Sequence, residues 1–107
     1  HDWWIKMIVT LDFNNINTKE EFHNYIQKKF SFKNYHNNLD SLYDEMTSFT
    51  NNVIIEIYNL NYIIDSLGNY ASTFIGLLED IKEERKNIVI SFKSWEYLNF
   101  FYFALFF

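Results

Sequence analysis

Short apolar segments and stretches with helical periodicity alternate along this chain. Three apolar segments rich in β-branched and aromatic residues predict strands, at Met7–Phe13, Val53–Tyr58 and Ile88–Phe92. Apolar residues at helical spacing predict helices at about 19–30, at about 38–48, at about 61–67 and from Asn69 onward. Apolar strands separated by helices favour parallel pairing with right-handed crossovers. The pattern therefore predicts a small α/β fold in which a three-stranded parallel sheet packs against helices.

Local signals mark the ends of the predicted helices. Thr18 followed by Glu21 matches a capping box, in which a hydroxyl and a carboxylate satisfy free amides at a helix start. Gly68 can end the short helical stretch in a left-handed conformation, and Asn69 can cap the helix that follows. Three helices carry an apolar stripe, formed by Phe22, Tyr25, Ile26 and Phe30, by Leu39, Leu42, Met46 and Phe49, and by Tyr70, Phe74, Leu77, Leu78 and Ile81.

We expect one domain over residues 7–93, with different roles for the two ends of the chain. Residues 1–6 precede Met7, which could be the natural start, and are interpreted as an extension. Residues 94–107 include the run LNFFYFALFF, which is too short to span a membrane and too apolar to remain solvated. We expect this tail to cover the sheet as an added strand or helix, while self-association and membrane contact stay open as alternatives.

Composition narrows the class of protein. The chain has no cysteine, which excludes disulfides, thiolate metal ligands and a cysteine nucleophile. It shows no signal-peptide pattern, and no apolar run reaches the roughly 18 residues of a membrane span. We therefore expect a cytoplasmic protein that does not associate with membranes.

The net charge of −5 is concentrated in the middle of the chain. Residues 1–33 and residues 82–107 each carry a net charge of +1, whereas residues 34–81 contain seven acidic residues and no Lys or Arg. An acidic surface repels nucleic acid and anionic membranes but attracts basic partners. We expect a basic protein as the partner, and no nucleic acid.

The predicted helix at 38–48 has an acidic face as well as an apolar one. At about 100° per residue, Asp40, Asp44 and Thr47 share an arc that is separate from the apolar stripe. Asp40 and Asp44 lie side by side without a basic neighbour in the local sequence, which costs a few tenths of a kcal/mol. Further aromatic and amide side chains frame these carboxylates, from Tyr35, Asn38 and Tyr43. Aromatic anchors beside charge are typical of binding hot spots, so the helix predicts a binding surface.

The stretch NYHNNLDSLYDEM resembles the signature of the barstar family, in which a Tyr-Tyr-Gly loop leads into an Asn-x-Asp-Ala-Leu-Trp-Asp helix. The motif's residues and spacing are kept at Tyr35, Asn38, Asp40, Leu42 and Asp44. The resemblance extends from Met7 through Phe92, with strands and helices in the family's order. It implies a barstar-like fold and an immunity-type protein that inhibits a small basic, guanyl-preferring ribonuclease of the barnase type. The helix and the preceding loop would cover the enzyme's catalytic cleft.

The resemblance also implies roles for individual side chains. Asp44 would lie where a substrate phosphate binds the nuclease, and Asp40 would receive a second basic contact. Asn38 would make a polar contact at the helix start, and Tyr35 and Tyr43 would supply aromatic surface. The full set expected to bind the partner is Asn34, Tyr35, Asn38, Asp40, Tyr43, Asp44, Thr47 and Asp80.

The chain departs from the family pattern at several of these positions. Asn34 stands in place of the first tyrosine of the loop, His36 in place of its glycine, and Ser41 in place of the motif's alanine. Tyr43 replaces the signature tryptophan, and Asp80 takes the place of a later helical glutamate. These changes leave the path of the loop and the identity of the nuclease open.

Two other classes of function compete with inhibition. A carboxylate pair can act as general acid and base, but Asp40 and Asp44 lie on one helix rather than on either side of a substrate. The chain has only two glycines, no phosphate-binding loop, no nucleophile motif and no further ligands at metal-binding spacing. We therefore expect no enzyme activity, no cofactor and no metal. An acidic interaction module for another basic protein shares every feature above and stays as the alternative.

Overall fold

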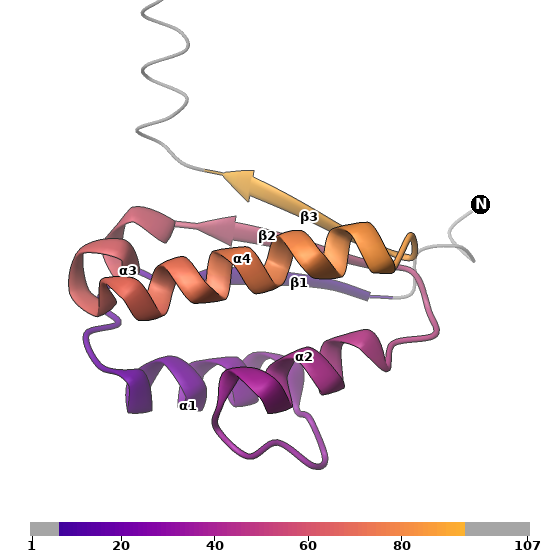
Figure 1. Ribbon diagram of the computed structural model, residues 1–107, viewed down its shortest axis with the longest axis horizontal. Coiled ribbons are helices and arrows are strands. Elements are labelled where there is room, and N and C mark those ends of the chain that lie inside the picture. Colours follow the sequence, from indigo (N-terminus) through magenta and orange to yellow (C-terminus); the bar gives the residue numbers. More distant parts are fainter. Residues whose placement is uncertain (1–6, 94–107) are drawn as a thin grey trace, which may run out of the picture.

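A computed structural model describes residues 7–93, which form one sheet and four helices (Figure 1). The elements follow the order β1 (Met7–Asp12), α1 (Lys19–Phe30), α2 (Leu39–Thr47), β2 (Val53–Tyr58), α3 (Leu60–Leu67), α4 (Asn69–Glu84) and β3 (Ile88–Lys93). β2 is the central strand and pairs in parallel with β1 and with β3. The α/β class and the three-stranded parallel sheet are thereby confirmed. The expected extension at 1–6 and the expected tail at 94–107 lie outside the described residues.

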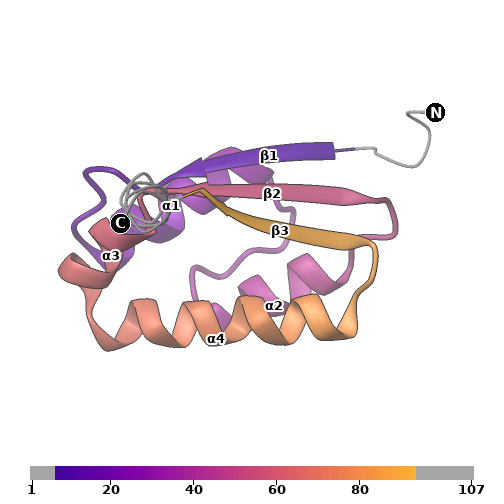
Figure 2. The same ribbon diagram turned by 90° about the horizontal axis from the view of Figure 1, so that it is seen from above.

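Within residues 7–93, helices cover only one face of the sheet. Along β1, Val9 and Leu11 are buried, whereas Ile8 on the opposite face is 61% exposed. The register places Ile8 beside Ile54 of β2, and Ile54 beside Val89 of β3. Three apolar side chains therefore form a row across the face opposite α2 and α4, with Ile8 and Val89 exposed and Ile54 half-buried. In Figure 2 the strands lie above α2 and α4, which occupy the covered side. None of the four helices is both long and apolar enough to cross a membrane.

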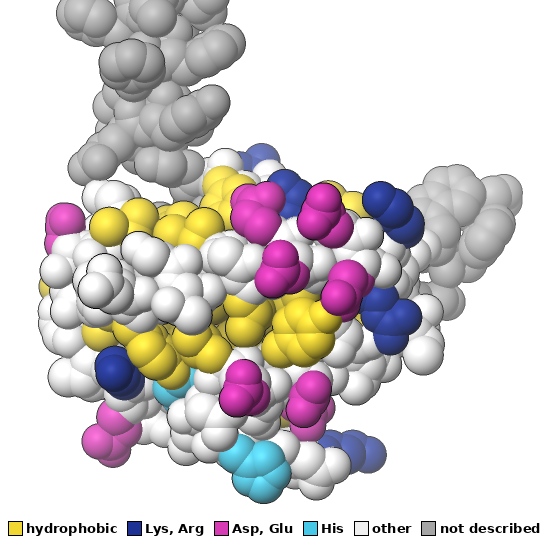
Figure 3. Space-filling model, viewed as in Figure 1, with side chains coloured by type: hydrophobic (Ala, Val, Ile, Leu, Met, Phe, Trp, Pro, Cys, Tyr) yellow, Lys and Arg dark blue, Asp and Glu magenta, His cyan; other side chains and the backbone are white. Residues whose placement is uncertain are grey.

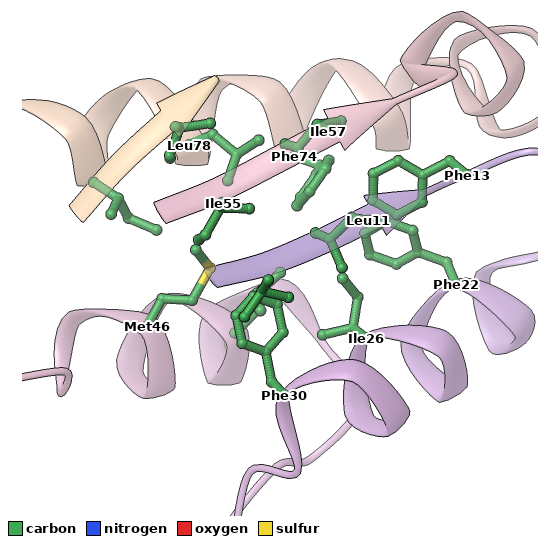
Figure 4. Close-up of a cluster of buried hydrophobic side chains, with 14 of the residues drawn as sticks. Leu11, Phe13, Phe22, Ile26, Phe30, Met46, Ile55, Ile57, Phe74 and Leu78 are labelled. Atoms are coloured by element: carbon green, nitrogen blue, oxygen red, sulfur yellow. The ribbon is translucent and has the colours of Figure 1, made fainter. Parts of the chain in front are cut away.

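The core lies between the sheet and the helices (Figure 4). Phe22 of α1 and Phe74 of α4 contact each other with ring centroids 4.9 Å apart, and both contact Phe13 just after β1. The remaining large and fully buried side chains are Leu11, Ile26, Leu42, Met46, Ile55, Ile57, Ile63, Leu78 and Ile81. One contiguous core therefore connects the sheet with α1, α2, α3 and α4.

The helix ends show which local signals were sufficient. The Thr18 hydroxyl accepts from the Glu21 amide at 3.1 Å, and the Glu21 carboxylate accepts from the Thr18 amide at 3.0 Å, so the capping box is confirmed. Gly68 ends α3 as predicted and has a positive φ of 58°, but its ψ of −124° lies outside the left-handed helical conformation that was expected. The prediction that Asn69 caps the next helix is wrong, because the same glycine also begins α4 and Asn69 is already its first helical residue.

The apolar stripe of α4 is narrower than the sequence predicted. Phe74 is buried, together with Leu78 and Ile81, but Tyr70 and Leu77 are only partly buried. These two residues lie at the margins of the stripe, where the side chains are half-buried. The margin that carries Leu77 borders the candidate site.

Candidate functional site

The acidic helix α2 has its apolar face in the core and its carboxylates in solvent. Leu42 and Met46 are buried, whereas Asp40 and Asp44 are exposed. The helix begins after Asn38, whose side-chain oxygen accepts from the Ser41 amide at 2.7 Å. The amide oxygen of Asn38 is therefore already used within the chain. The apolar face is confirmed at Leu42 and Met46 and the acidic face at Asp40 and Asp44, whereas Leu39, Phe49 and Thr47 are half-buried.

A groove of about 630 Å³ lies between α2 and α4. It is lined by Asp40, Tyr43, Asp44, Thr73, Gly76, Leu77 and Asp80. The two carboxylates of α2 thus lie opposite the carboxylate of Asp80 on α4, and no basic residue of the described chain lines the groove. Figure 3 shows acidic side chains on both sides of a band of hydrophobic side chains. The groove therefore combines negative walls with an apolar floor.

The α4 wall of this groove was only partly anticipated. Asp80 belonged to the expected binding set, but Thr73 and Gly76 did not, and Leu77 was assigned to the core stripe. All four lie on one face of α4, because positions 73, 76, 77 and 80 follow helical spacing. Extending the face of Asp80 backward by three, four and seven residues would have found them. Gly76 has no side chain that could narrow the groove. Apart from neighbouring residues of its own helix, a Cβ at this position would have no heavy atom within 4 Å.

A second hollow, of about 380 Å³, lies on the other side of the acidic helix. Its lining consists of Asn34, His36, Asn38, Asp40, Ser41, Asp44 and Glu45. Asp40 and Asp44 line both hollows, so they form a ridge between them. A partner that covered α2 could reach these two carboxylates from either side.

The loop before α2 turns at a different residue from the one that the family pattern indicated. The left-handed conformation lies at Asn37, with a φ of 56°, rather than at His36, the position matched to the family's glycine. Asparagine tolerates this conformation better than most residues. The His36 amide donates to the Ser41 hydroxyl at 2.9 Å, which ties the loop to the first turn of α2. The loop therefore makes its left-handed turn without a glycine.

Tyr35 is partly withdrawn from the surface by a buried histidine. His23 of α1 is only 3% exposed, and its two ring nitrogens form hydrogen bonds with the hydroxyls of Tyr35 and Tyr70. A neutral imidazole donates through one nitrogen and accepts through the other, so one hydroxyl accepts and the other donates. Burial raises the pKa of Tyr35 and lowers the pKa of His23. His23 is thus a packed residue, and it joins the loop before α2 to α4.

The protein is expected to lose stability as the pH falls through about 6.5, the ordinary pKa of histidine. Since burial lowers the folded-state pKa of His23, the unfolded chain binds this proton more readily, and acid favours unfolding. The ammonium of Lys19, 4.6 Å from the centre of the Tyr70 ring, adds a second positive charge nearby. Urea unfolding at pH 5 and pH 7 should show a smaller difference for His23→Gln than for the wild type. The exposed His36→Gln is the control, and equal differences in all three proteins would contradict the prediction.

The two other expected residues of α2, Tyr43 and Thr47, make hydrogen bonds within the protein. The Thr47 hydroxyl donates to the Tyr43 carbonyl at 2.8 Å, and Thr47 is not among the residues that line either hollow. The Tyr43 hydroxyl donates to the carboxylate of Glu84 on α4. This hydrogen bond is the main reason why the pKa of Tyr43 is raised. Glu84 was not in the binding set expected from the sequence, because no local pattern connects it to α2. Within residues 7–93, no group of three His, Asp or Glu side chains is close enough to hold a metal ion.

Comparison with known proteins assigns the chain to a family. The sequence model of the family described as Barstar (barnase inhibitor) matches residues 6–94. A search of curated proteins finds no match. The family match includes all seven described elements and both walls of the groove. It is a family of ribonuclease inhibitors rather than enzymes. The chain therefore belongs to the barstar family.

Proposed function

We propose that this protein inhibits a small basic ribonuclease of the barnase type with a guanyl preference. α2 and the loop before it would cover the active site of the nuclease. Membership of a barnase-inhibitor family supports this proposal at the level of the family. The observation that carries it to this chain is the ridge of Asp40 and Asp44 between two hollows, with Asp80 on the facing wall.

Electrostatic mimicry of RNA explains how this surface would block the enzyme. A ribonuclease cleft binds phosphates with lysine and arginine side chains, and carboxylates of the inhibitor would occupy the same positions. Opposite charges speed the encounter of the two proteins, and desolvated pairs between carboxylates and basic groups then slow their separation. The proposed contact set is Asn34, Tyr35, Asn38, Asp40, Tyr43, Asp44, Thr47 and Asp80.

The apolar floor of the groove adds to the fit with a basic side chain. Tyr43 and Leu77 lie between the carboxylates of α2 and α4. Arginine and lysine have long apolar stems that pack on such surfaces while their charged ends reach polar groups. One groove could therefore hold the stem of a basic residue on Tyr43 and Leu77 and its charge on a carboxylate.

Inhibition of RNA cleavage tests the proposal directly. A barnase-type ribonuclease titrated with this protein should lose activity at a stoichiometry of about one to one, because one surface would cover one cleft. The inhibition constant should rise between low and high salt, since screening weakens the attraction between charged surfaces. Full activity of the nuclease in the presence of excess inhibitor, at low salt, would contradict the proposal.

A second candidate is an interaction module for another basic protein. Two observations favour it, namely the engagement of Tyr35 with His23 and the turn at Asn37 in place of a glycine. Both alter the loop that would complete the contact with a barnase-type enzyme. If this protein bound other basic proteins through Asp44 but left the nuclease active, that result would support the alternative.

A further inference from the structure

The end of α4 is joined to α2 and to the segment after it by a group of hydrogen bonds. The Tyr43 hydroxyl donates to Glu84, and the Arg85 guanidinium donates to the Thr47 carbonyl. The side-chain amide of Asn87 donates to the carbonyls of Phe49 and Asn51, at 2.9 and 2.7 Å. We call the side chains of Glu84, Arg85 and Asn87, with the groups that they bind, the α4–α2 clasp.

The acidic helix has a particular need for such a contact. α2 has nine residues and carries Asp40, Asp44 and Glu45, with no basic residue in its last turn. The carbonyls at a helix C-terminus carry partial negative charge, so carboxylates nearby are unfavourable and cations are favourable. The guanidinium of Arg85 supplies from another element the positive charge that α2 itself lacks.

The clasp also controls the shape of the groove. Glu84 holds the hydroxyl of Tyr43, whose side chain lines the groove between Asp44 and Asp80. Arg85 holds the last turn of α2, which follows Asp44 in the chain. Both contacts therefore act on the position of the carboxylate ridge relative to α4.

We propose that Glu84 and Arg85 are positioning residues of the inhibitory surface, which act on the partner through Tyr43 and α2. This inference rests on the proposed function. A surface that is already held in its binding geometry loses less freedom when it binds, so its affinity is higher. Both residues are exposed in the free protein, where they contact a helix that has no basic residue of its own in its last turn.

Arg85 offers a test in which positioning and simple electrostatics predict opposite signs. Removal of a positive charge from an acidic protein strengthens its long-range attraction for a basic nuclease. If Arg85 acted only as a surface charge, Arg85→Ala would improve inhibition. Lys86→Ala is the matched control, because Lys86 is the next residue, is exposed and carries the same charge.

We expect Arg85→Ala to weaken inhibition by roughly 3- to 10-fold, the typical cost of ordering one or two side chains on binding. Lys86→Ala should leave inhibition unchanged or slightly improve it. Glu84→Ala should weaken inhibition as well, whereas Glu84→Gln, which keeps an acceptor for the Tyr43 hydroxyl, should stay close to the wild type. Equal behaviour of Arg85→Ala and Lys86→Ala, or equal losses for Glu84→Ala and Glu84→Gln, would overturn the inference.

Amide hydrogen exchange of the free protein separates this inference from the proposed function. Arg85→Ala should speed exchange in the last turn of α2 by roughly 3- to 10-fold through local opening, and leave α1 unchanged. Lys86→Ala should change neither helix. If Arg85→Ala speeds exchange in α2 but neither the wild type nor any variant inhibits the nuclease, the proposed function is refuted, whereas the role of the clasp in ordering α2 is supported. Unchanged exchange in α2 would refute the clasp, whatever the nuclease assay shows.

Discussion

Replacement of Asp44 by alanine is expected to weaken inhibition of a barnase-type ribonuclease by roughly 30-fold or more, as for a central hot-spot residue. Asp44 lies on the ridge and lines both hollows, so a covering partner could reach its carboxylate from either side, as it could that of Asp40. Its loss would leave a basic group of the nuclease desolvated and unpaired in the complex. Parallel inhibition titrations of the two proteins at one ionic strength provide the measurement.

The fold itself should tolerate this change. Asp44 is exposed, and its removal also relieves the repulsion from Asp40 one helical turn earlier. The urea midpoint should therefore stay the same or rise slightly. Asp65→Ala is the matched control, since Asp65 is exposed on α3, does not line either hollow and carries the same charge. If both variants lost inhibition equally, net charge rather than the ridge would account for binding.

Phe74→Ala is expected to have the largest effect on stability, about 3–5 kcal/mol. Phe74 is 1% exposed, and its ring contacts those of Phe22 and Phe13, at centroid distances of 4.9 and 5.7 Å. The substitution would create a cavity where α4, α1 and the end of β1 meet. Since domains of this size are stable by about 5–15 kcal/mol, a large share of the folding free energy would be lost. Urea unfolding of the wild type and the variant measures the difference.

Phe92→Ala provides the comparison for the same chemical change outside the core. Phe92 of β3 is 36% exposed, so its truncation removes less buried surface and leaves no enclosed cavity. The loss of stability should be clearly smaller than for Phe74→Ala. Similar losses for the two variants would contradict the special contribution that we assign to the cluster of Phe74, Phe22 and Phe13.

Local signals along the chain accounted for most of the secondary structure. The capping box at Thr18 and the apolar spacing that follows placed α1 at its observed bounds, because both signals act within a few residues. β2 also matched, since Val53–Tyr58 is a run of β-branched and apolar residues between polar ones. The prediction for Asn69 failed because Gly68 serves two consecutive helices, a geometry that residue preferences do not report.

The burial of individual side chains was predicted less well. Ile8 and Val89 are apolar residues of apolar strands, yet they are exposed on the face of the sheet opposite α2 and α4. Tyr70 and Leu77 follow the helical spacing of α4, yet they lie at the margin of its buried stripe. Periodicity indicates on which face of its own strand or helix a side chain lies. Whether that side chain is buried depends on which other elements pack against that face.

The sequence by itself determined the order of strands and helices, the family signature, and the acidic face of α2, whose carboxylates are exposed. Each of these depends on spacing within one element. Only the tertiary structure decided that Asp80 faces α2, that Glu84 and Arg85 bind it, and that His23 joins two tyrosines. Those contacts join residues 12 to 47 positions apart in sequence. They depend on how helices pack around a shared core, which no local pattern encodes.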